Sequence, residues 1–204
     1  MSASSSTLDY YQHHAKSFVD QTFNVDMSKV YMPFLQALPN DSQKILDIGC
    51  GSGRDAIHFA KLGYRVTAID ASQPLIEWAK THDSTNLVEW QYLTFEDLLT
   101  SDWQGKFDGI WACASLLHCP FNELTILLAK LSNCLNKNGV LYASFKYGDS
   151  ERYDNERFFC DMNETRWQQL TQYLGLSTLN LWLTKDNRSQ SSQVWFNVLM
   201  RKTY

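Results

Sequence analysis

The sequence predicts an α/β fold built on a parallel sheet, because short β-branched and apolar runs alternate with segments of helical period. Two further observations favour this fold. A glycine-rich stretch at 49–53 follows the first apolar run, and the continuous apolar run at 107–113 is typical of a strand buried on both faces. The 204 residues fit one domain, or one domain with a lid.

The N-terminal part predicts two helices ahead of the first strand. Residues 1–7 are serine-rich without a basic start, so we expect a disordered lead-in and no secretion signal. Residues 8–19 and 27–38 then show helical periodicity. We divide the chain into an N-terminal part, 1–43, and a main domain, 44–204. The first part either forms a lid over a ligand or packs on the sheet.

The main domain opens with repeated strand–loop–helix units. Strands are expected at 44–48 and 65–69, and helices at 55–62 and 72–80, the second with serine at its N-cap and proline in its first turn. Alternating apolar residues predict a third strand at 88–92.

The second half of the domain adds two more parallel strands and an edge pair. The strand at 107–113 is followed by a leucine-rich helix at 124–135 and a strand at 140–145. Residues 146–163 read as a long loop, which is usually functional. After a helix at 164–174, the strands expected at 178–184 and 193–201 form an antiparallel pair at the sheet edge.

Composition and charge narrow the cellular setting. Eighteen Lys and Arg against twenty-two Asp and Glu give a net charge of −4, which argues against nucleic-acid or membrane-surface partners. The longest uncharged apolar stretch, 109–120, is too short to span a bilayer. The five cysteines form no CxxC pair, so we expect free, mostly buried thiols and no metal site. Without an expected secretion signal or membrane span, we expect a cytoplasmic protein.

The strongest local signal is the segment ILDIGCGSGRD at 45–55. A glycine-rich turn between a buried strand and a helix lets a ligand approach the backbone. A dinucleotide fingerprint would have glycine where this sequence has Arg54, so the turn is not the usual pyrophosphate cradle. Asp70 ends the second strand, where a carboxylate can accept hydrogen bonds from both hydroxyls of a ribose.

These residues resemble motifs of class I S-adenosylmethionine-dependent methyltransferases, over 44–145 and into the final hairpin. The resemblance implies a Rossmann-like, doubly wound, seven-stranded sheet, mostly parallel with an antiparallel last strand, plus an N-terminal helical lid. Arg54 with the segment 63–67 is similar to small-molecule methyltransferases of the tellurite-resistance group. The Pro-Pro-aromatic signature of amino-type DNA methyltransferases is absent.

The resemblance also implies contacts to S-adenosylmethionine from four segments of the domain. It places Asp47 and the glycine turn near the methionyl part, Asp70 on the ribose and Thr94 to Glu96 at the adenine. The common acidic residue near Thr94 is missing, and only Glu96 and Asp97 follow. The implied cofactor-binding residues are Asp47, Gly49, Cys50, Gly51, Gly53, Arg54, Asp70, Ala71, Ser72, Thr94, Phe95, Glu96, Ala112 and Cys113.

The sequence gives fewer indications of which residues bind the methyl acceptor. His118 is the candidate general base for a hydroxyl or amine acceptor, and its alternative role is that of a hydrogen-bonded histidine at a strand end. A thiolate, selenolate or oxyanion acceptor would not need a base. The candidate acceptor-binding residues are Tyr11, Ser115, Lys146, Tyr147, Arg152 and Arg157.

Together, these observations predict a methyltransferase that acts on a small-molecule acceptor as a monomer or homodimer. Its main task would be to align acceptor and methyl group and to exclude water. Two alternatives remain: a non-catalytic S-adenosylmethionine-binding regulatory module and, with less support, a nicotinamide-dependent oxidoreductase.

Overall fold

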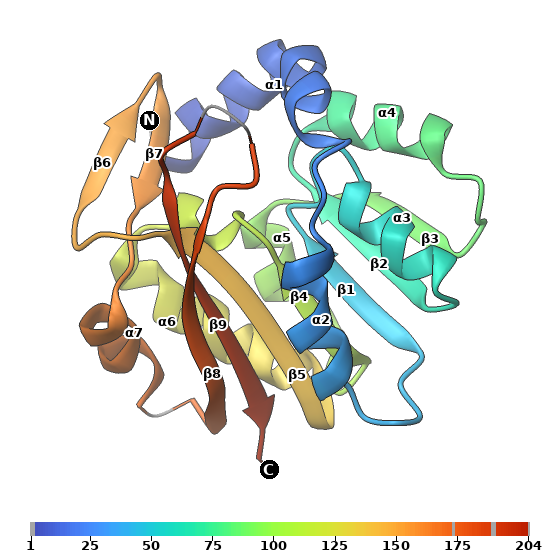
Figure 1. Ribbon diagram of the computed structural model, residues 1–204, viewed down its shortest axis with the longest axis vertical. Coiled ribbons are helices and arrows are strands. Elements are labelled where there is room, and N and C mark those ends of the chain that lie inside the picture. The colour runs from blue at the N-terminus through green and yellow to red at the C-terminus, as the bar shows by residue number, and fades with distance from the viewer. Residues whose placement is uncertain (1–2, 173, 189–190, 204) are drawn as a thin grey trace.

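The computed structural model describes residues 3–172, 174–188 and 191–203, and it confirms the predicted fold class. Seven strands form one sheet in the order β3-β2-β1-β4-β5-β9-β8, with helices on both faces (Figure 1). The strands are β1 (Lys44–Ile48), β2 (Arg65–Asp70), β3 (Val88–Tyr92), β4 (Phe107–Ala112), β5 (Leu135–Lys146), β8 (Leu176–Lys185) and β9 (Val194–Lys202).

The sheet is parallel from β3 to β5, and β9 is antiparallel to both of its neighbours, β5 and β8. The central strand β1 pairs with β2 on one side and β4 on the other, so Ile45 lies between Val66 and Gly109. The direction in which successive strands are added reverses at β1 and β4. In open parallel sheets, ligands bind at this switch point, beyond the carboxyl ends of the strands.

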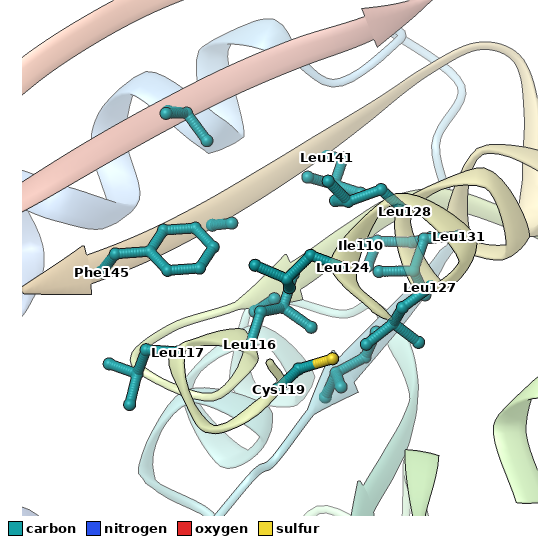
Figure 2. Packing of buried hydrophobic residues seen from close by; sticks show 14 of the residues in the cluster. Ile110, Leu116, Leu117, Cys119, Leu124, Leu127, Leu128, Leu131, Leu141 and Phe145 are labelled. Carbon is teal, nitrogen blue, oxygen red and sulfur yellow. The ribbon is translucent and has the colours of Figure 1, made fainter. Parts of the chain in front are cut away.

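The two faces of the sheet are covered by different helices. Buried side chains of α2 and α3, such as Phe34 and Phe59, pack on one face, and those of α6 and α7 pack on the other. Figure 2 shows the leucines of α6 against Ile110 of β4 and Leu141 of β5. The helices are α1 (Ala3–Thr22), α2 (Ser28–Ala37), α3 (Arg54–Lys61), α4 (Gln73–His82), α5 (Phe95–Thr100), α6 (Phe121–Cys134) and α7 (Glu164–Thr171).

The N-terminal helix is longer than the sequence predicts. Helix α1 begins at Ala3, so the expectation of a disordered lead-in is wrong for residues 3–7, while residues 1–2 lie outside the described part of the chain. The reason is a tertiary contact: the buried Thr7 hydroxyl accepts a hydrogen bond from the Phe158 amide at 2.9 Å. Helix α1 contacts both β7 and α4, and it runs above the sheet between them (Figure 1).

The segment expected as a long loop contains a β-hairpin instead. Strands β6 (Glu151–Asp154) and β7 (Arg157–Cys160) pair antiparallel through a two-residue turn. Asn155 and Glu156 in that turn have φ of 47° and 67°, as a type I′ turn requires. Glutamate is uncommon at the second position, so the sequence carries only half of the usual turn signal.

Two other elements differ from the expectation. Helix α5 was not predicted, although Thr94 and Asp97 form a reciprocal capping box at its start. Strand β5 begins at Leu135, directly after α6, instead of after the expected turn at Asn138, which has a φ of 65° within an irregular stretch of the strand.

All five cysteines are free, as predicted, and every one except the half-buried Cys113 is buried. Within the described ranges, no helix has the length and apolar character needed to cross a bilayer.

Candidate active site

The turns after β1 and β2 are joined by one carboxylate. The Oδ2 atom of Asp70 accepts a hydrogen bond from the Gly51 amide, and its Oδ1 atom accepts one from the Ser72 amide, each at 2.8 Å. The Gly49 and Cys50 amides donate to the Ile69 carbonyl at 2.8 and 3.0 Å. The glycine-rich turn and the end of β2 therefore form one unit at the switch point of the sheet.

The three glycines of the first turn all have positive φ, which side chains disfavour. A Cβ on Gly51 would lie 2.8 Å from the Phe18 ring of α1, and a Cβ on Gly53 would lie 2.7 Å from Ala79 and from Trp90. Gly49 similarly makes room for Ser115. The missing side chains thus allow the protein's own elements to approach, and α1 lies directly on the turn.

A cavity of about 470 Å³ opens beside this unit, within the roughly 300–1,000 Å³ range of small-molecule sites. Its walls come from α1, the glycine turn, the ends of β2 and β4, the start of α5, the β7 strand and the β8–β9 connection. Sixteen predicted site residues line it: Tyr11, Gly49, Cys50, Gly51, Arg54, Asp70, Ala71, Ser72, Thr94, Phe95, Glu96, Cys113, Ser115, His118, Lys146 and Arg157.

Three residues expected at the cofactor do not line this cavity. Gly53 is packed against α4 and β3, and Ala112 is fully buried in the core. Asp47 is buried behind the turn, and its Oδ2 atom has no hydrogen-bond partner in the part of the chain that the structure describes. Burial raises the pKa of the Asp47 carboxyl, and the neighbouring Asp55 adds to this effect.

Two residues expected at the acceptor also lie outside the cavity. The Tyr147 side chain is exposed, and its hydroxyl donates to the Glu164 carboxylate. The Arg152 guanidinium is held by Asp161, whose Oδ2 atom is 2.8 Å from Nε. Neither side chain lines the cavity in this structure, so their assignment to acceptor binding stays a prediction that this geometry does not support.

A compensated ion pair sits at the start of α3. Arg54 donates two hydrogen bonds to Asp55, from Nε at 2.6 Å and from Nη2 at 2.9 Å. Asp55 also accepts from the Tyr31 hydroxyl and from Trp111 Nε1. Although burial opposes it, the charge of Arg54 lowers the pKa of Asp55. The pair brings no uncompensated charge to the cavity.

His118 is oriented from both sides. Its Nδ1 atom lies 2.7 Å from the Phe158 carbonyl oxygen, which only accepts, so Nδ1 carries the proton. The Nε2 atom is then free to accept from the Tyr11 hydroxyl, 3.1 Å away. Burial lowers the pKa of His118 to about 4, and the cations Arg157 and Lys146 contribute in the same direction. The imidazole is therefore neutral near pH 7, with its lone pair on Nε2.

This arrangement predicts that His118 keeps one neutral tautomer between about pH 5 and pH 8, a window in which an ordinary imidazole changes charge. The measurement is a pH series of nitrogen NMR spectra on histidine-labelled protein, with His118→Gln used to assign the signals. Titration of the His118 signals near pH 6.5 would contradict the geometry.

Several cavity residues were not expected from local sequence. Phe18 and Thr22 come from α1, and Tyr142 and Asn197 join through a 2.7 Å hydrogen bond across β5 and β9. The end of β8 and the β8–β9 connection add the polar residues 184–188. No motif marks these positions, because long-range packing brings them to the cavity.

Comparison with known proteins fits this geometry. A family model described as a methyltransferase domain matches residues 45–139. The ubiquinone biosynthesis O-methyltransferase of Xanthomonas campestris pv. campestris (strain B100) is 34% identical over 116 residues, 56% of this chain and 46% of that protein. A similar enzyme from Pelagibacter ubique is 34% identical over 104 residues, 51% of this chain and 42% of that protein. This chain thus spans less than half the length of the curated relatives it matches.

Solved structures share the architecture along nearly the whole chain. The 1,6-didemethyltoxoflavin-N1-methyltransferase of Burkholderia thailandensis, with bound 1,6-didemethyltoxoflavin and S-adenosylhomocysteine, matches with a TM-score of 0.78 and 20% identity. The match covers 98% of this chain and 87% of that one. At this identity, the likeness shows the fold.

Proposed function

We propose that this protein transfers the methyl group of S-adenosylmethionine to a small-molecule acceptor by in-line displacement, in the cavity beside Asp70. The observation that carries the proposal is the position of this carboxylate at the carboxyl end of β2, where it holds the glycine turn that lies at the switch point of the sheet. Each Asp70 oxygen accepts one backbone hydrogen bond, which leaves acceptor capacity on both. Two such oxygens in the wall of a cavity suit the two hydroxyls of a ribose.

Other groups in the same wall fit a nucleoside with a polar tail. The hydroxyls of Ser72 and Ser115 are buried and have no hydrogen-bond partner within the described ranges, although both residues line the cavity. Thr94, Phe95 and Glu96 at the start of α5 would hold the base. The amides of Gly49, Cys50, Gly51 and Gly53 are already used by internal hydrogen bonds, which disfavours a pyrophosphate and hence a nicotinamide cofactor.

S-adenosylmethionine, when bound, supplies a sulfonium methyl group whose bond to sulfur breaks as the bond to the acceptor forms. The protein's own task is to align the acceptor and to exclude water. Helix α1 serves the second purpose as a lid, because Phe18 covers the glycine turn and Tyr11 bonds to His118. For a hydroxyl or amine acceptor, Nε2 of His118 would take the proton once the acceptor replaces the Tyr11 hydroxyl, which donates to that atom in this structure. The sequence Arg54-Asp55 directly after the glycine turn supports membership of the tellurite-resistance group of small-molecule methyltransferases.

The experiment that tests this function is a parallel calorimetric titration with S-adenosylmethionine, S-adenosylhomocysteine and NAD. We expect saturable binding of the first two and none of NAD. Binding of NAD alone would overturn the proposal. A regulatory module would bind both adenosyl ligands yet transfer no methyl group to any member of a broad acceptor panel.

The titration should also depend on pH through Asp70. Burial raises the pKa of this carboxyl to about 6, against the hydrogen bonds from Gly51 and Ser72. Above this pH the group is ionised and accepts freely; below it, a proton must be released before both oxygens can accept. Affinity for S-adenosylhomocysteine should therefore fall as the pH is lowered through about 6. The Asp70→Asn variant should lose this dependence, and its persistence there would rule out Asp70 as the source.

A further inference from the structure

Five lysine and arginine side chains line the cavity, and they fall into three groups. Arg54 and Arg188 are each paired with a carboxylate close in sequence, Asp55 and Asp186. Hydrogen bonds from Arg188 lower the pKa of Asp186 to about 2, although burial opposes this. These two arginines are therefore neutralised within the protein. Lys185, the last residue of β8, is exposed to solvent. The remaining two, Lys146 and Arg157, lie together on the side of the cavity that faces β7.

Arg157 has no such compensation. Within the described ranges, no carboxylate oxygen lies within 4.0 Å of its guanidinium, and its buried Nε atom has no hydrogen-bond partner. The group is held in place by aromatic rings, since its central carbon is 4.6 Å from the Tyr10 ring centroid and 5.2 Å from that of Phe159. A partly buried cation with an unused donor is costly unless a ligand satisfies it.

Lys146 shares this corner and is only weakly paired. Its Nζ atom lies over the Phe159 ring, 3.5 Å from the centroid, and its contact with Asp154 is long, at 3.7 Å. Burial lowers the pKa of Lys146, and the cations Arg152 and Arg157 add to this effect. The two charges repel one another, so an anion placed between them would relieve both burial and repulsion.

The unpaired carboxylates of the cavity lie away from Lys146 and Arg157, so these two residues form its positive end. The cavity carboxylates that are not paired with arginine, Asp70 and Glu96, lie at the end of β2 and in α5, on the side proposed for the nucleoside. We propose that Arg157 and Lys146 bind an oxyanion on the methyl acceptor, so that the acceptor is a small organic anion, such as a carboxylate. This inference rests on the proposed function, because it takes the cavity to be the site of a methyl acceptor.

The chemistry favours Arg157 as the principal contact. A guanidinium presents a planar fork of donors that matches the two oxygens of a carboxylate, whereas an ammonium acts as a point charge. Burial is the main cause of the low pKa of His118, and the two cations add to it. An anion bound here would offset the contribution of the cations and would thereby make the imidazole a stronger base when the acceptor is bound.

The test is a calorimetric titration of the full chain with benzoate and with neutral benzamide as probes, and with inorganic phosphate as a second oxyanion. The variants are Arg157→Gln, the charge-preserving Arg157→Lys, and Arg152→Gln. Arg152 is the matched control, because it lies on the paired strand β6, carries the same charge and is engaged by Asp161 outside the cavity. Affinity for S-adenosylhomocysteine and thermal stability are measured for every variant.

We expect benzoate or phosphate to bind saturably, and the tighter of the two identifies the group that the corner prefers. Arg157→Gln should weaken that binding by roughly tenfold or more, as loss of a charged hydrogen bond does, while Arg157→Lys retains part of it. Arg152→Gln removes a charge that acts on Lys146 only from outside the cavity, so its effect on binding should be clearly smaller than that of Arg157→Gln. Benzamide should bind more weakly than benzoate.

Four results would overturn the proposal: no saturable binding of either anion, equal binding of benzoate and benzamide, equal losses in Arg157→Gln and Arg152→Gln, or an equal loss of S-adenosylhomocysteine affinity in Arg157→Gln. The last would assign Arg157 to the cofactor. Failure of the proposed function gives a different pattern, because the unmodified protein would then not bind S-adenosylhomocysteine, whatever its response to benzoate.

Discussion

Replacement of Gly51 by valine should abolish the binding of S-adenosylhomocysteine. Gly51 has a φ of 53°, and its missing Cβ leaves room for the Phe18 ring, which would be only 2.8 Å from the new atom. A β-branched residue in this left-handed conformation costs about 1–2 kcal/mol in backbone strain alone. The side chain would also displace α1 and disturb the Gly51 amide that donates to Asp70. Calorimetry should show no saturable heat.

The control for this variant is Gly63→Val. Gly63 also has a positive φ, of 97°, but nothing lies within 4 Å of its would-be Cβ. This variant therefore has backbone strain without a clash, so it should lower the melting temperature and leave ligand affinity unchanged. If folded Gly51→Val protein bound S-adenosylhomocysteine normally, the turn would not form part of the binding site.

Replacement of Asp70 by alanine should weaken S-adenosylhomocysteine binding by about 1.5–3 kcal/mol, or roughly 10- to 150-fold, the usual cost of lost hydrogen bonds to a charged group. Part of this loss would be indirect, because Asp70 also holds the Gly51 and Ser72 amides in place. Calorimetric titration at pH 7.5 measures the loss.

A control carboxylate is available on the neighbouring helix α4. Glu77 is exposed, and its carboxylate accepts a hydrogen bond from the Gln73 side-chain amide on the same helix. Glu77→Ala therefore changes the net charge equally without touching the cavity. It should leave affinity unchanged. Equal affinities of folded Asp70→Ala and unmodified protein would exclude Asp70 from the ribose site.

The sheet was predictable because its signals are local. Strands β1, β2 and β4 are mainly apolar, and each is followed by a turn and a helix, as in the unit from Lys44 to Lys61. The hairpin β6–β7 and helix α5 were missed because they are short. Four-residue strands with charged side chains and a turn without glycine at Glu156 give little periodicity to detect.

The candidate site was predictable where its residues belong to short sequence motifs. The glycine turn and Asp70 are adjacent through the β1–β2 pairing, which the spacing of two strand–turn–helix units already implies. The acceptor side depends on register and long-range packing. Arg152 and Arg157 are both basic residues of one segment, but only the register of β6 with β7 decides that Arg157 faces the cavity. The covering of the turn by Phe18 likewise follows from the packing of α1.

The most direct test of the central claim is a crystal structure of the protein with S-adenosylhomocysteine. We predict that both ribose hydroxyls lie within hydrogen-bond distance of the Asp70 carboxylate, with the adenine beside the start of α5. An adenosine group placed elsewhere, or a ribose that does not contact Asp70, would contradict the account.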